Sequence, residues 1–439
     1  MPRRKKEDQP KEQLKVIKTP SLVGGIKDIL PADGKYWDYI LGEINRVVRD
    51  HSFSKMSLPV IEKYELFNHT LFKHSGQIEK EVLSFVDRGE KLALRPDTTP
   101  GLARAFLEHN MINQKMPLKA YYWGPSFRWG KVEENKLRQF TQVGFEIIGD
   151  PSPAIDAELI IISHYLLKSF KIESEIKLNS LGCLVCRHEY NKTLSGFLKS
   201  KRSAVCMDCR KQAVKDPYRF FRCESNKCQH LREDAPQIID WLCDSCRNHL
   251  FRVLEYLDEL KIPYQLDPFL LRTYDYYSKT IFEIFTQDEK KQPLSIAGGG
   301  RWDYLIEMLG GPSVPAAGVS MGLERLINQM KVTRAEIPNP QAPDIFVAQL
   351  SELARKKAFA FFEQLRQEDL SVRANFSKSS LKEQLDQATK VGAKLILILG
   401  QKEVTEGTVI LREVDSGIQE VVNFSKVIPE VKKRLKIIK

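Results

Sequence analysis

The 439-residue chain is too long for one compact core, and its length predicts two or three domains. Hydrophobic residues make up 42% and charged residues 28%, which is the balance of a soluble globular protein. No apolar run approaches the roughly 20 residues that a membrane span needs, and residues 1–20 form a basic tail without the apolar segment of a signal peptide. We therefore expect a cytoplasmic protein with no membrane partner.

Basic residues outnumber acidic ones along the chain. The 68 lysines and arginines against 57 aspartates and glutamates give a net charge of +11. An excess of this size favours a polyanionic partner, but a merely soluble basic protein would show the same excess. Charge alone therefore leaves both interpretations open.

The first 330 residues predict an α+β domain built around an antiparallel sheet. Apolar residues at helical spacing begin near Lys35, and short apolar or aromatic runs separated by loops follow from Leu58 to Gly149. Helices are predicted over 99–109 and 154–170, with a glycine-rich turn and a helix over 318–330. Strands are predicted over 91–96, 118–124, 139–149, 280–286 and 293–300.

The pattern changes after a linker of lysine, proline and polar residues at 331–343. Strands and helices then alternate, which predicts a small α/β domain with a mostly parallel sheet. The strands are expected over 344–350, 371–375, 394–400, 408–413 and 420–424, and the helices over 352–368, 380–391 and 425–436. The expected organisation is thus a tail (1–20), an α+β domain (21–335) interrupted by an insertion (175–262), and an α/β domain (342–439).

One predicted strand carries several polar residues at alternate positions. Arg128 ends an aromatic strand, and after a polar loop a second strand bears Arg138, Gln142 and Glu146. Because side chains alternate along a strand, these last three residues share one face. Such a face is either a polar exterior or the floor of a pocket.

Two further clusters carry charged residues beside aromatic or hydroxyl groups. Asp97, Thr98 and Thr99 stand where a strand meets a helix, and capping of that helix is the simpler interpretation. Arg272 precedes a run of three tyrosines, which suits a clamp for a carboxylate or phosphate. An exposed arginine on an aromatic strand explains the second cluster equally well.

Two glycine-rich segments complete the set. Gly298, Gly299 and Gly300 form a turn that would allow a ligand to approach the backbone closely, and Arg325 begins a helix after a glycine-containing strand. Neither segment matches a Walker or dinucleotide-binding fingerprint, so each is weak evidence when taken alone.

In their order and spacing, these five clusters closely resemble the histidyl-tRNA synthetase family of class II aminoacyl-tRNA synthetases, in its bacterial type. The resemblance covers the chain from about Ser21 to its C-terminus, and its most specific part is the string R-x-x-D-Y-Y-x-x-T-x-F-E at 272–283. It implies a class II antiparallel-sheet catalytic domain, a helical cysteine-rich insertion and a C-terminal α/β anticodon-binding domain.

The resemblance also implies an activity. A histidine–tRNA ligase activates L-histidine with ATP, in the presence of Mg²⁺, and transfers histidine to the 3′ end of tRNA(His). The family works as a homodimer through a region that corresponds to residues 35–60. The alternative is a non-catalytic paralogue, similar to the regulatory subunit of ATP phosphoribosyltransferase, which would bind histidine or a partner enzyme.

Site residues follow from the same resemblance. Arg128 and Arg272 would lie at the α-phosphate and the histidine carboxylate, and Arg325 at the γ-phosphate, as the catalytic cations. ATP would also contact Lys136 and Arg138. Histidine would be held by Asp97, Thr98, Thr99, Arg128, Gln142, Glu146, Arg272, Tyr276 and Tyr277. An acidic group and an amide suit an imidazole because together they can bond both ring nitrogens.

The chain departs from the usual family pattern at four positions, two of them among these site residues. Asp97 and Gly130 each replace a glutamate, Lys136 replaces an arginine, and Trp302 replaces a tyrosine. The changes at 130 and 136 fall in or beside the loop that reads the acceptor end of the tRNA in this family.

All eight cysteines lie in one segment, in four closely spaced pairs. They are Cys183 and Cys186, Cys206 and Cys209, Cys223 and Cys228, and Cys243 and Cys246. Four thiolates make a closed tetrahedral zinc site, so this spacing predicts one or two structural Zn²⁺ ions. An iron–sulfur cluster and unligated reduced thiols remain as alternatives.

Two segments carry much of the positive charge. Residues 183–250 contain 13 basic and 8 acidic residues, a balance of +5, and residues 342–439 contain 17 and 13, a balance of +4. Both segments could therefore contact the phosphates of tRNA.

Overall fold

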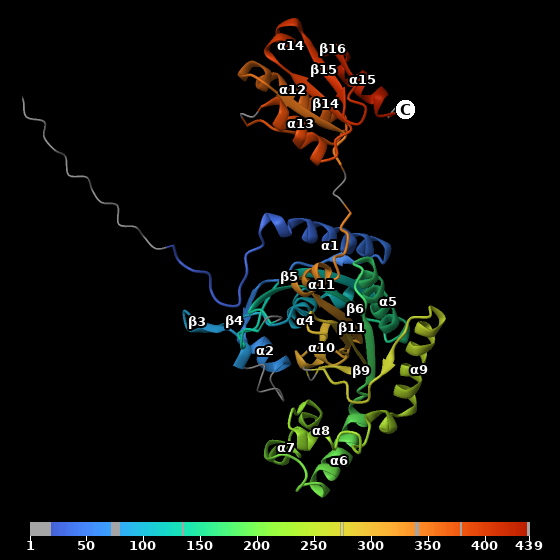
Figure 1. The fold of residues 1–439 in the computed structure, drawn as a ribbon. Coiled ribbons are helices and arrows are strands. Elements are labelled where there is room, and N and C mark those ends of the chain that lie inside the picture. The colour runs from blue at the N-terminus through green and yellow to red at the C-terminus, as the bar shows by residue number, and fades with distance from the viewer. Residues whose placement is uncertain are drawn as a thin grey trace, which may run out of the picture. The chain divides into compact units, whose positions relative to one another are not determined.

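The computed structural model describes residues 19–71, 80–133, 136–272, 274, 276–338, 342–377 and 380–436. The chain folds as two compact units, one reaching to Glu336 and the other starting at Ile337 (Figure 1). None of the described helices is long and apolar enough to cross a membrane. Most of the expected N-terminal tail, and residues 339–341 of the expected linker, lie outside the described residues.

A mainly antiparallel sheet organises the larger unit. Its eight described strands take the order β1-β5-β6-β11-β10-β9-β7-β8. They are β1 (Ser54–Lys55), β5 (Leu118–Phe127), β6 (Gln139–Ile148), β7 (Glu175–Ser180), β8 (Gln265–Leu266), β9 (Ser278–Gln287), β10 (Pro293–Arg301) and β11 (Ala316–Gly322). The outermost pairs, β1–β5 and β7–β8, are parallel, and the pairs between them are antiparallel. The predicted antiparallel α+β architecture is therefore confirmed.

Long helices cover one face of this sheet. They are α1 (Pro31–Asp50), α5 (Pro153–Ser169) and α11 (Leu323–Val332), with α9 (Asp244–Glu259) packed against α5. α5 begins at Pro153 because the Ser152 side chain accepts a hydrogen bond from the Ala154 backbone N–H at 3.2 Å. Apolar residues of β6, including Val143 and Phe145, are fully buried, and Phe145 contacts Phe53.

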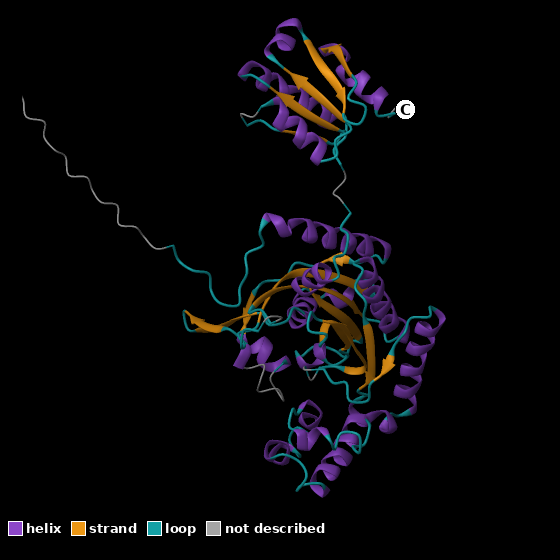
Figure 2. Cartoon of the chain, in the orientation of Figure 1, coloured by secondary structure: helices purple, strands orange, loops and turns teal. Residues whose placement is uncertain are grey.

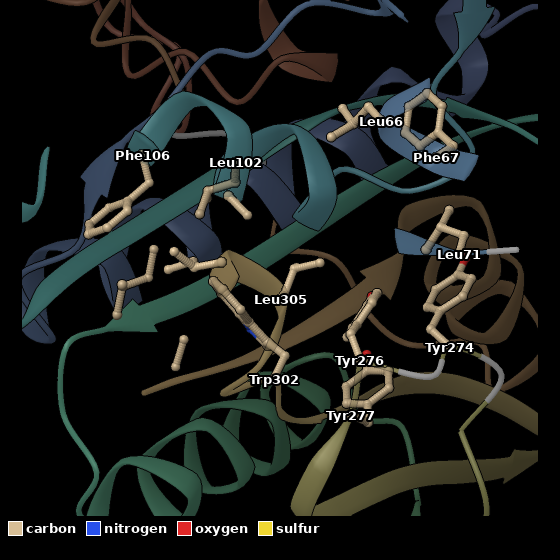
Figure 3. Packing of buried hydrophobic residues seen from close by; sticks show 14 of the residues in the cluster. Leu66, Phe67, Leu71, Leu102, Phe106, Tyr274, Tyr276, Tyr277, Trp302 and Leu305 are labelled. Atoms are coloured by element: carbon tan, nitrogen blue, oxygen red, sulfur yellow. The ribbon is translucent and has the colours of Figure 1, made fainter. Parts of the chain in front are cut away.

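The opposite face carries smaller elements and an aromatic core. Here β2 (Ile61–Lys63), β4 (Glu90–Leu94) and β3 (Ser84–Asp87) form a separate sheet in that order, beside α2 (Tyr64–Thr70), α4 (Thr99–Glu108), η1 (Met111–Asn113) and α10 (Leu305–Met308). Figure 3 shows the buried side chains that meet on this face, among them Leu102, Phe106, Tyr274, Tyr276, Tyr277, Trp302 and Leu305. The residues of the resemblance thus lie on the side of the sheet away from the long helices.

The cysteine-rich segment is helical, as Figure 2 shows. Between β7 and β8 the chain forms α6 (Leu184–Ser200), α7 (Met207–Gln212), η2 (Pro217–Arg222), α8 (Asn226–Gln229), η3 (Ile238–Trp241) and α9. Buried residues such as Tyr190, Leu194 and Phe220 give it a core of its own. The insertion expected at 175–262 starts with β7, but β7 pairs with β9 in the main sheet, so the helical part begins only at Leu184.

The smaller unit contains a five-stranded sheet among its described residues, in the order β13-β12-β14-β15-β16. Its elements are β12 (Ile345–Gln349), α12 (Glu352–Gln367), β13 (Val372–Ala374), α13 (Leu381–Lys390), β14 (Leu395–Leu399), α14 (Gln401–Glu406), β15 (Thr408–Glu413), β16 (Gln419–Asn423), η4 (Phe424–Lys426) and α15 (Val427–Arg434). The expectation of a mostly parallel sheet is wrong. The pairs β12–β13 and β12–β14 are parallel, whereas β14–β15 and β15–β16 are antiparallel. The short turn at 414–418 cannot supply the crossover of roughly a dozen residues that parallel pairing would need.

Candidate active site and thiol clusters

Two polar residues of β6, Gln142 and Glu146, lie on the aromatic side of the sheet; we call this pair the acidic wall. Gln142 and Glu146 project from this strand and are only 6% and 1% exposed, so this face is not a polar exterior. Arg138 precedes β6, which begins at Gln139, but its carbonyl accepts from the Arg128 N–H at 2.9 Å, so it lies opposite Arg128 in the register of β5 and β6. Its guanidinium stacks on Trp129 and donates hydrogen bonds to two backbone carbonyls of the neighbouring segments.

Three hydrogen bonds fix the Glu146 carboxylate. Oε1 accepts from Thr99 Oγ1 at 2.8 Å and from the Tyr122 hydroxyl at 3.3 Å, and Oε2 accepts from Trp302 Nε1 at 2.8 Å. Burial raises the pKa of Glu146 to about 8, although the three donors favour the charged form. A positively charged group placed beside this side chain would favour its ionised form.

Two glycines, one on β11 and one on β6, leave room for buried side chains on this face of the sheet. A Cβ on Gly318 would overlap with the Glu146 carboxylate, and a Cβ on Gly144 would overlap with the Tyr122 ring. Both glycines therefore allow a buried side chain to lie flat against the sheet. Close approach of this kind is a common reason for glycine within a strand.

Asp97 combines the two interpretations that the sequence left open. Its Oδ1 accepts a hydrogen bond from the Thr99 backbone N–H at 3.0 Å, at the start of α4. Its Oδ2 lies 3.6 Å from Arg128 Nη2. The Thr98 hydroxyl is buried and has no hydrogen-bond partner, so it does not cap the helix. One carboxylate thus orders the helix start and faces the site.

The arginines of the site come from three distant segments. Arg128 donates to the Pro96 carbonyl at 3.1 Å and to the Tyr274 hydroxyl at 3.0 Å, while 39% of its side chain stays exposed. Arg272 lies over the Tyr277 ring, with Nη1 at 3.5 Å from the Glu283 carboxylate. It fits there because a Cβ on Gly298 would overlap with its guanidinium.

Arg325 completes the group of cations. Its Nη1 donates to the Ser295 carbonyl at 2.6 Å. Burial, together with the positive charge of Arg128, lowers the pKa of Arg325. Guanidinium groups that repel one another in this way would be stabilised by an anion placed between them.

Several polar groups in the site lack a partner within the protein. Among the described residues, these buried atoms include Thr98 Oγ1, Arg272 Nε, Tyr276 OH, Ser278 Oγ and Thr280 Oγ1. A buried polar atom without a hydrogen bond costs about 1–3 kcal/mol, so such a group is expected to meet a ligand or water. Burial also raises the pKa values of Tyr276 and Tyr277, which keeps both hydroxyls protonated as donors.

Not every expected site residue lies in this group. Lys136 is 62% exposed and pairs with Glu133 at 2.9 Å within the loop before β6. The sequence reasoning also missed two residues of β5, Tyr122 and Ser126; the Ser126 hydroxyl donates to Gln142 Oε1 at 2.7 Å. Alternation along β5 could have revealed them, because Tyr122 pairs with Gly144 and Ser126 with Phe140, in the row that also holds Gln142 and Glu146.

The eight thiols form two groups in the described structure. The near cluster contains Cys183, Cys186, Cys243 and Cys246, and the far cluster contains Cys206, Cys209, Cys223 and Cys228. Within each cluster the four sulfur atoms lie within 4.8 Å of one another, and none of the eight is in a disulfide. The sequence alone does not show which cysteines share a site. In the structure, the first and fourth pairs along the chain form one cluster, and the second and third pairs form the other.

Both clusters fit a tetrahedral metal ion. A Zn–S bond of about 2.3 Å places tetrahedral sulfurs about 3.8 Å apart. The Sγ atoms of Cys183 and Cys186 are separated by 3.6 Å, and those of Cys206 and Cys223 by 3.7 Å. The backbone N–H of Cys209 donates to Cys206 Sγ, and this bond lowers the pKa of the Cys206 thiol to about 7, whereas burial raises the pKa of the Cys209 and Cys228 thiols. Thiolates are the form that binds metal.

The fold and site define the class of protein. An antiparallel sheet with arginines and an acidic wall on one face is the catalytic core of a class II aminoacyl-tRNA synthetase. The crystal structure of apo histidyl-tRNA synthetase from S. aureus matches with a TM-score of 0.78 at 28% identity, covering 94% of this chain and 100% of that one.

Sequence comparison gives the family. A histidine–tRNA ligase of Syntrophotalea carbinolica is 37% identical over 400 residues, which cover 91% of this chain and 94% of the relative. The family model for histidyl-tRNA synthetase matches residues 25–326, and that for the anticodon binding domain matches residues 344–434. The chain belongs to the histidyl-tRNA synthetase family.

A regulatory protein shares the fold at lower similarity. A Bacillus halodurans C protein described as an ATP phosphoribosyltransferase regulatory subunit/histidyl-tRNA synthetase matches with a TM-score of 0.58 at 17% identity, covering 88% of this chain and 100% of that one. At this identity the match shows only a common fold.

Proposed function

We propose that the protein is a histidine–tRNA ligase, which activates L-histidine with ATP and transfers it to the 3′ end of tRNA(His). The observation that carries this proposal is the meeting of three arginines with an acidic, hydroxyl-rich wall in one buried site. Arg128, Arg272 and Arg325 suit a polyphosphate and a carboxylate, and Glu146 beside Gln142 suits an imidazole.

In the first step, an oxygen of the histidine carboxylate attacks the α-phosphorus of ATP, and the bond to the β-phosphate oxygen breaks to release pyrophosphate. Arg128 and Arg272 stabilise the negative charge that develops around the α-phosphorus, and Arg325 binds the γ-phosphate. ATP enters as its magnesium complex, which is part of the substrate. Arg128 and Arg325 donate hydrogen bonds to neutral carbonyl and hydroxyl groups. Arg128 and Arg272 also lie 3.6 and 3.5 Å from the carboxylates of Asp97 and Glu283, which help to orient them.

The histidine side chain lies against the acidic wall in this proposal. Glu146 and Gln142 bond the two imidazole nitrogens, and Asp97 and Thr99 hold the amino group. The free hydroxyl of Tyr276 supports this placement, because a ligand would satisfy it. A site with these polar groups rejects amino acids that leave them unpaired.

In the second step, a ribose hydroxyl of the terminal adenosine of tRNA(His) attacks the acyl carbon, and AMP leaves. We propose that residues 21–335, interrupted by the insertion at 175–262, form the catalytic domain. Residues 342–439 would bind the anticodon of the tRNA. The match of residues 344–434 to an anticodon binding domain supports the second assignment. The positive balances of the insertion and of the smaller unit suit contacts with phosphate.

We further propose that each thiol cluster holds one structural Zn²⁺ ion. The spacing of the sulfurs supports this assignment over unligated thiols. Protein purified without chelator should contain about two Zn²⁺ ions per chain, because four thiolates fill one tetrahedral site. Metal analysis by inductively coupled plasma mass spectrometry measures this ratio; iron, or no stoichiometric metal, would contradict the assignment.

A homodimer formed through residues 35–60 and a location in the cytoplasm complete the proposal. Apolar side chains exposed beside this region support a dimer, namely Leu22, Val23, Ile29, Leu30 and Ile61. Eight cysteines without a disulfide fit a reducing compartment.

Pyrophosphate exchange tests the first step and separates the ligase from the regulatory alternative. Wild-type protein should incorporate labelled pyrophosphate into ATP only when L-histidine is present. Arg272→Ala should lower this rate at least ~100-fold, the typical loss when one donor to a developing oxyanion is removed, and should leave ATP binding in place. Exchange at a wild-type rate in the variant would remove Arg272 from the chemistry, and no exchange by the wild-type protein would favour the regulator.

A further inference from the structure

We propose that the near cluster, Cys183, Cys186, Cys243 and Cys246, is a metal site that positions the histidine pocket. The far cluster, in contrast, mainly stabilises the fold of the insertion. This inference rests on the proposed function and adds to it a role for one particular metal ion. It follows from where the near cluster lies and from the contacts of the residues next to its cysteines.

The near cluster lies where the chain enters and leaves the helical insertion. Cys183 and Cys186 are at the start of α6, directly after β7, and Cys243 and Cys246 are at the start of α9. The Cys243 backbone N–H donates to Cys186 Sγ at 3.1 Å, which brings the two helix starts together. A metal ion bound here therefore joins both connections between the insertion and the sheet.

The first connection leads to the tyrosine side of the pocket. Arg187, which follows Cys186 on α6, donates from Nη1 to the backbone carbonyl of Tyr277 at 3.1 Å. The backbone N–H of Lys279 donates to the Gly182 carbonyl at 2.9 Å, directly before Cys183. A shift of the α6 start would thus move the backbone that presents Tyr276 and Tyr277.

The second connection leads to the glutamate wall. His249, one turn after Cys246 on α9, lies 2.6 Å from Asp156 Oδ2 through its Nε2 atom, and Asp156 Oδ1 accepts from Arg301 at 2.8 Å. All three side chains are more than nine-tenths buried. Arg301 directly precedes Trp302, which donates to Glu146.

A third contact links the start of α6 to the segment that carries Trp302. The Leu184 backbone N–H donates to the Tyr304 hydroxyl at 3.4 Å, two residues after Trp302. The near cluster is therefore linked by hydrogen bonds to both the tyrosine side and the glutamate side of the pocket. Because the hydrogen bond from Trp302 to Glu146 depends on distance and direction, small displacements at the cluster would change the histidine contacts.

The far cluster has a different setting. Its cysteines belong to or adjoin the separate core of the insertion, around Tyr190 and Phe220. In the described structure, this core meets the sheet domain through apolar contacts, such as Phe221 against Phe269 at 5.5 Å between ring centroids. Apolar contacts of this kind are non-directional and transmit a displacement less specifically than hydrogen bonds.

Two arginines provide a matched pair of variants. Arg187 and Arg247 each follow the second cysteine of a near-cluster pair. Arg187 donates to the Tyr277 carbonyl, whereas the Arg247 guanidinium contacts the Leu242 carbonyl and the Asp244 carboxylate at the start of its own helix. Both variants should keep the metal, so they separate the loss of a link from the loss of zinc.

The experiment measures zinc content, histidine affinity by calorimetry and the KM values of pyrophosphate exchange on the full chain. Arg187→Ala should retain about two Zn²⁺ ions and weaken histidine binding about tenfold, since it removes a charged hydrogen bond to the pocket backbone. The KM for ATP should change much less, and Arg247→Ala should resemble the wild type.

The cysteine variants test the metal itself. Cys243→Ser/Cys246→Ser should lose one Zn²⁺ ion and weaken histidine binding by at least as much as Arg187→Ala. Cys206→Ser/Cys209→Ser should also lose one Zn²⁺ ion but affect histidine binding far less. If the near-cluster double variant does not fold, as judged by circular dichroism, the two arginine variants still decide the question.

Equal histidine affinities in Arg187→Ala and Arg247→Ala, or equal effects of the two cysteine pairs, would overturn the inference while leaving the ligase intact. Absence of exchange in the wild-type protein would instead contradict the proposed function. Calorimetric histidine binding does not depend on that activity and would still test the link to the pocket.

Discussion

Glu146 illustrates how a single residue combines packing with chemistry. It is almost fully buried, it accepts three hydrogen bonds, and burial raises its pKa to about 8. Its ordinary value is 4.5, so between these two values the folded protein holds a proton that the unfolded chain has lost. Proton linkage then requires that the free energy of unfolding falls as the pH rises through this window.

This linkage gives a prediction for Glu146→Gln, which removes the titration and keeps the size of the side chain. The stability of the wild-type protein relative to this variant should fall between pH 5 and pH 8, by at most ~1.4 kcal/mol per pH unit, and level off above pH 8. Urea unfolding of both proteins at several pH values measures the difference. A difference that stays constant across this range would contradict the raised pKa.

Alternation along a strand predicts which residues share a face, but not which partners their side chains find. The period-two rule correctly placed Gln142 and Glu146 together, because both lie within β6. Arg138 continues the same register, opposite Arg128, but its guanidinium stacks on Trp129 and donates to backbone carbonyls. Such side-chain partners depend on distant segments, which one sequence does not reveal.

At the scale of elements, the site depends on strands that approach without side chains between them. Gly318 on β11 lies against Glu146 on β6, and Gly298 on β10 lies against Arg272. A string of glycines in the sequence was weak evidence for a ligand site when taken alone. In the fold, these glycines instead leave space for charged side chains of neighbouring segments.

Gly318→Ala tests this role of glycine. The new methyl group would overlap with the Glu146 carboxylate, so we expect a loss of about 1–3 kcal/mol in the free energy of unfolding and a higher KM for histidine. Thermal or urea unfolding and pyrophosphate exchange provide the two measurements. Gly196→Ala is the control, because nothing lies within 4 Å of its added methyl group. Equal behaviour of the two variants would show that the wall tolerates the extra volume.

The thiol pairs show a second limit at this scale. Each close pair of cysteines was evident in the sequence, and the spacing predicted metal binding. Which pairs share a site depends on where α6 and α9 start: the Cys243 N–H donates to Cys186 Sγ, and the meeting of the two helix starts brings Cys183 beside Cys246 rather than beside Cys206. Local spacing carries no information about this tertiary contact.

At the scale of the whole molecule, the chain contains two compact units with different sheet types. The antiparallel body was predicted because alternating runs and loops are local signals. The smaller unit was predicted as α/β from the alternation of strands and helices, but its mixed pairing was missed. The last two strands are antiparallel because the turn that joins them, at 414–418, is too short for the crossover that parallel pairing needs.

At the scale of the whole molecule, the positive charge can be assigned to particular segments. The insertion and the smaller unit each carry a basic excess, and the smaller unit matches an anticodon binding domain. We therefore expect both segments to contact the same tRNA during the second step, and their contribution to weaken as the salt concentration rises. This expectation concerns the complete chain, not the sheet domain alone.

Aminoacylation by the complete chain tests the central claim most directly. With labelled L-histidine, ATP, Mg²⁺ and a tRNA(His) transcript, the protein should form acid-precipitable histidyl-tRNA, and it should form none when ATP is omitted or when a tRNA of another specificity is used. Activation of histidine without any transfer to tRNA(His), or equal charging of the unrelated tRNA, would contradict the account.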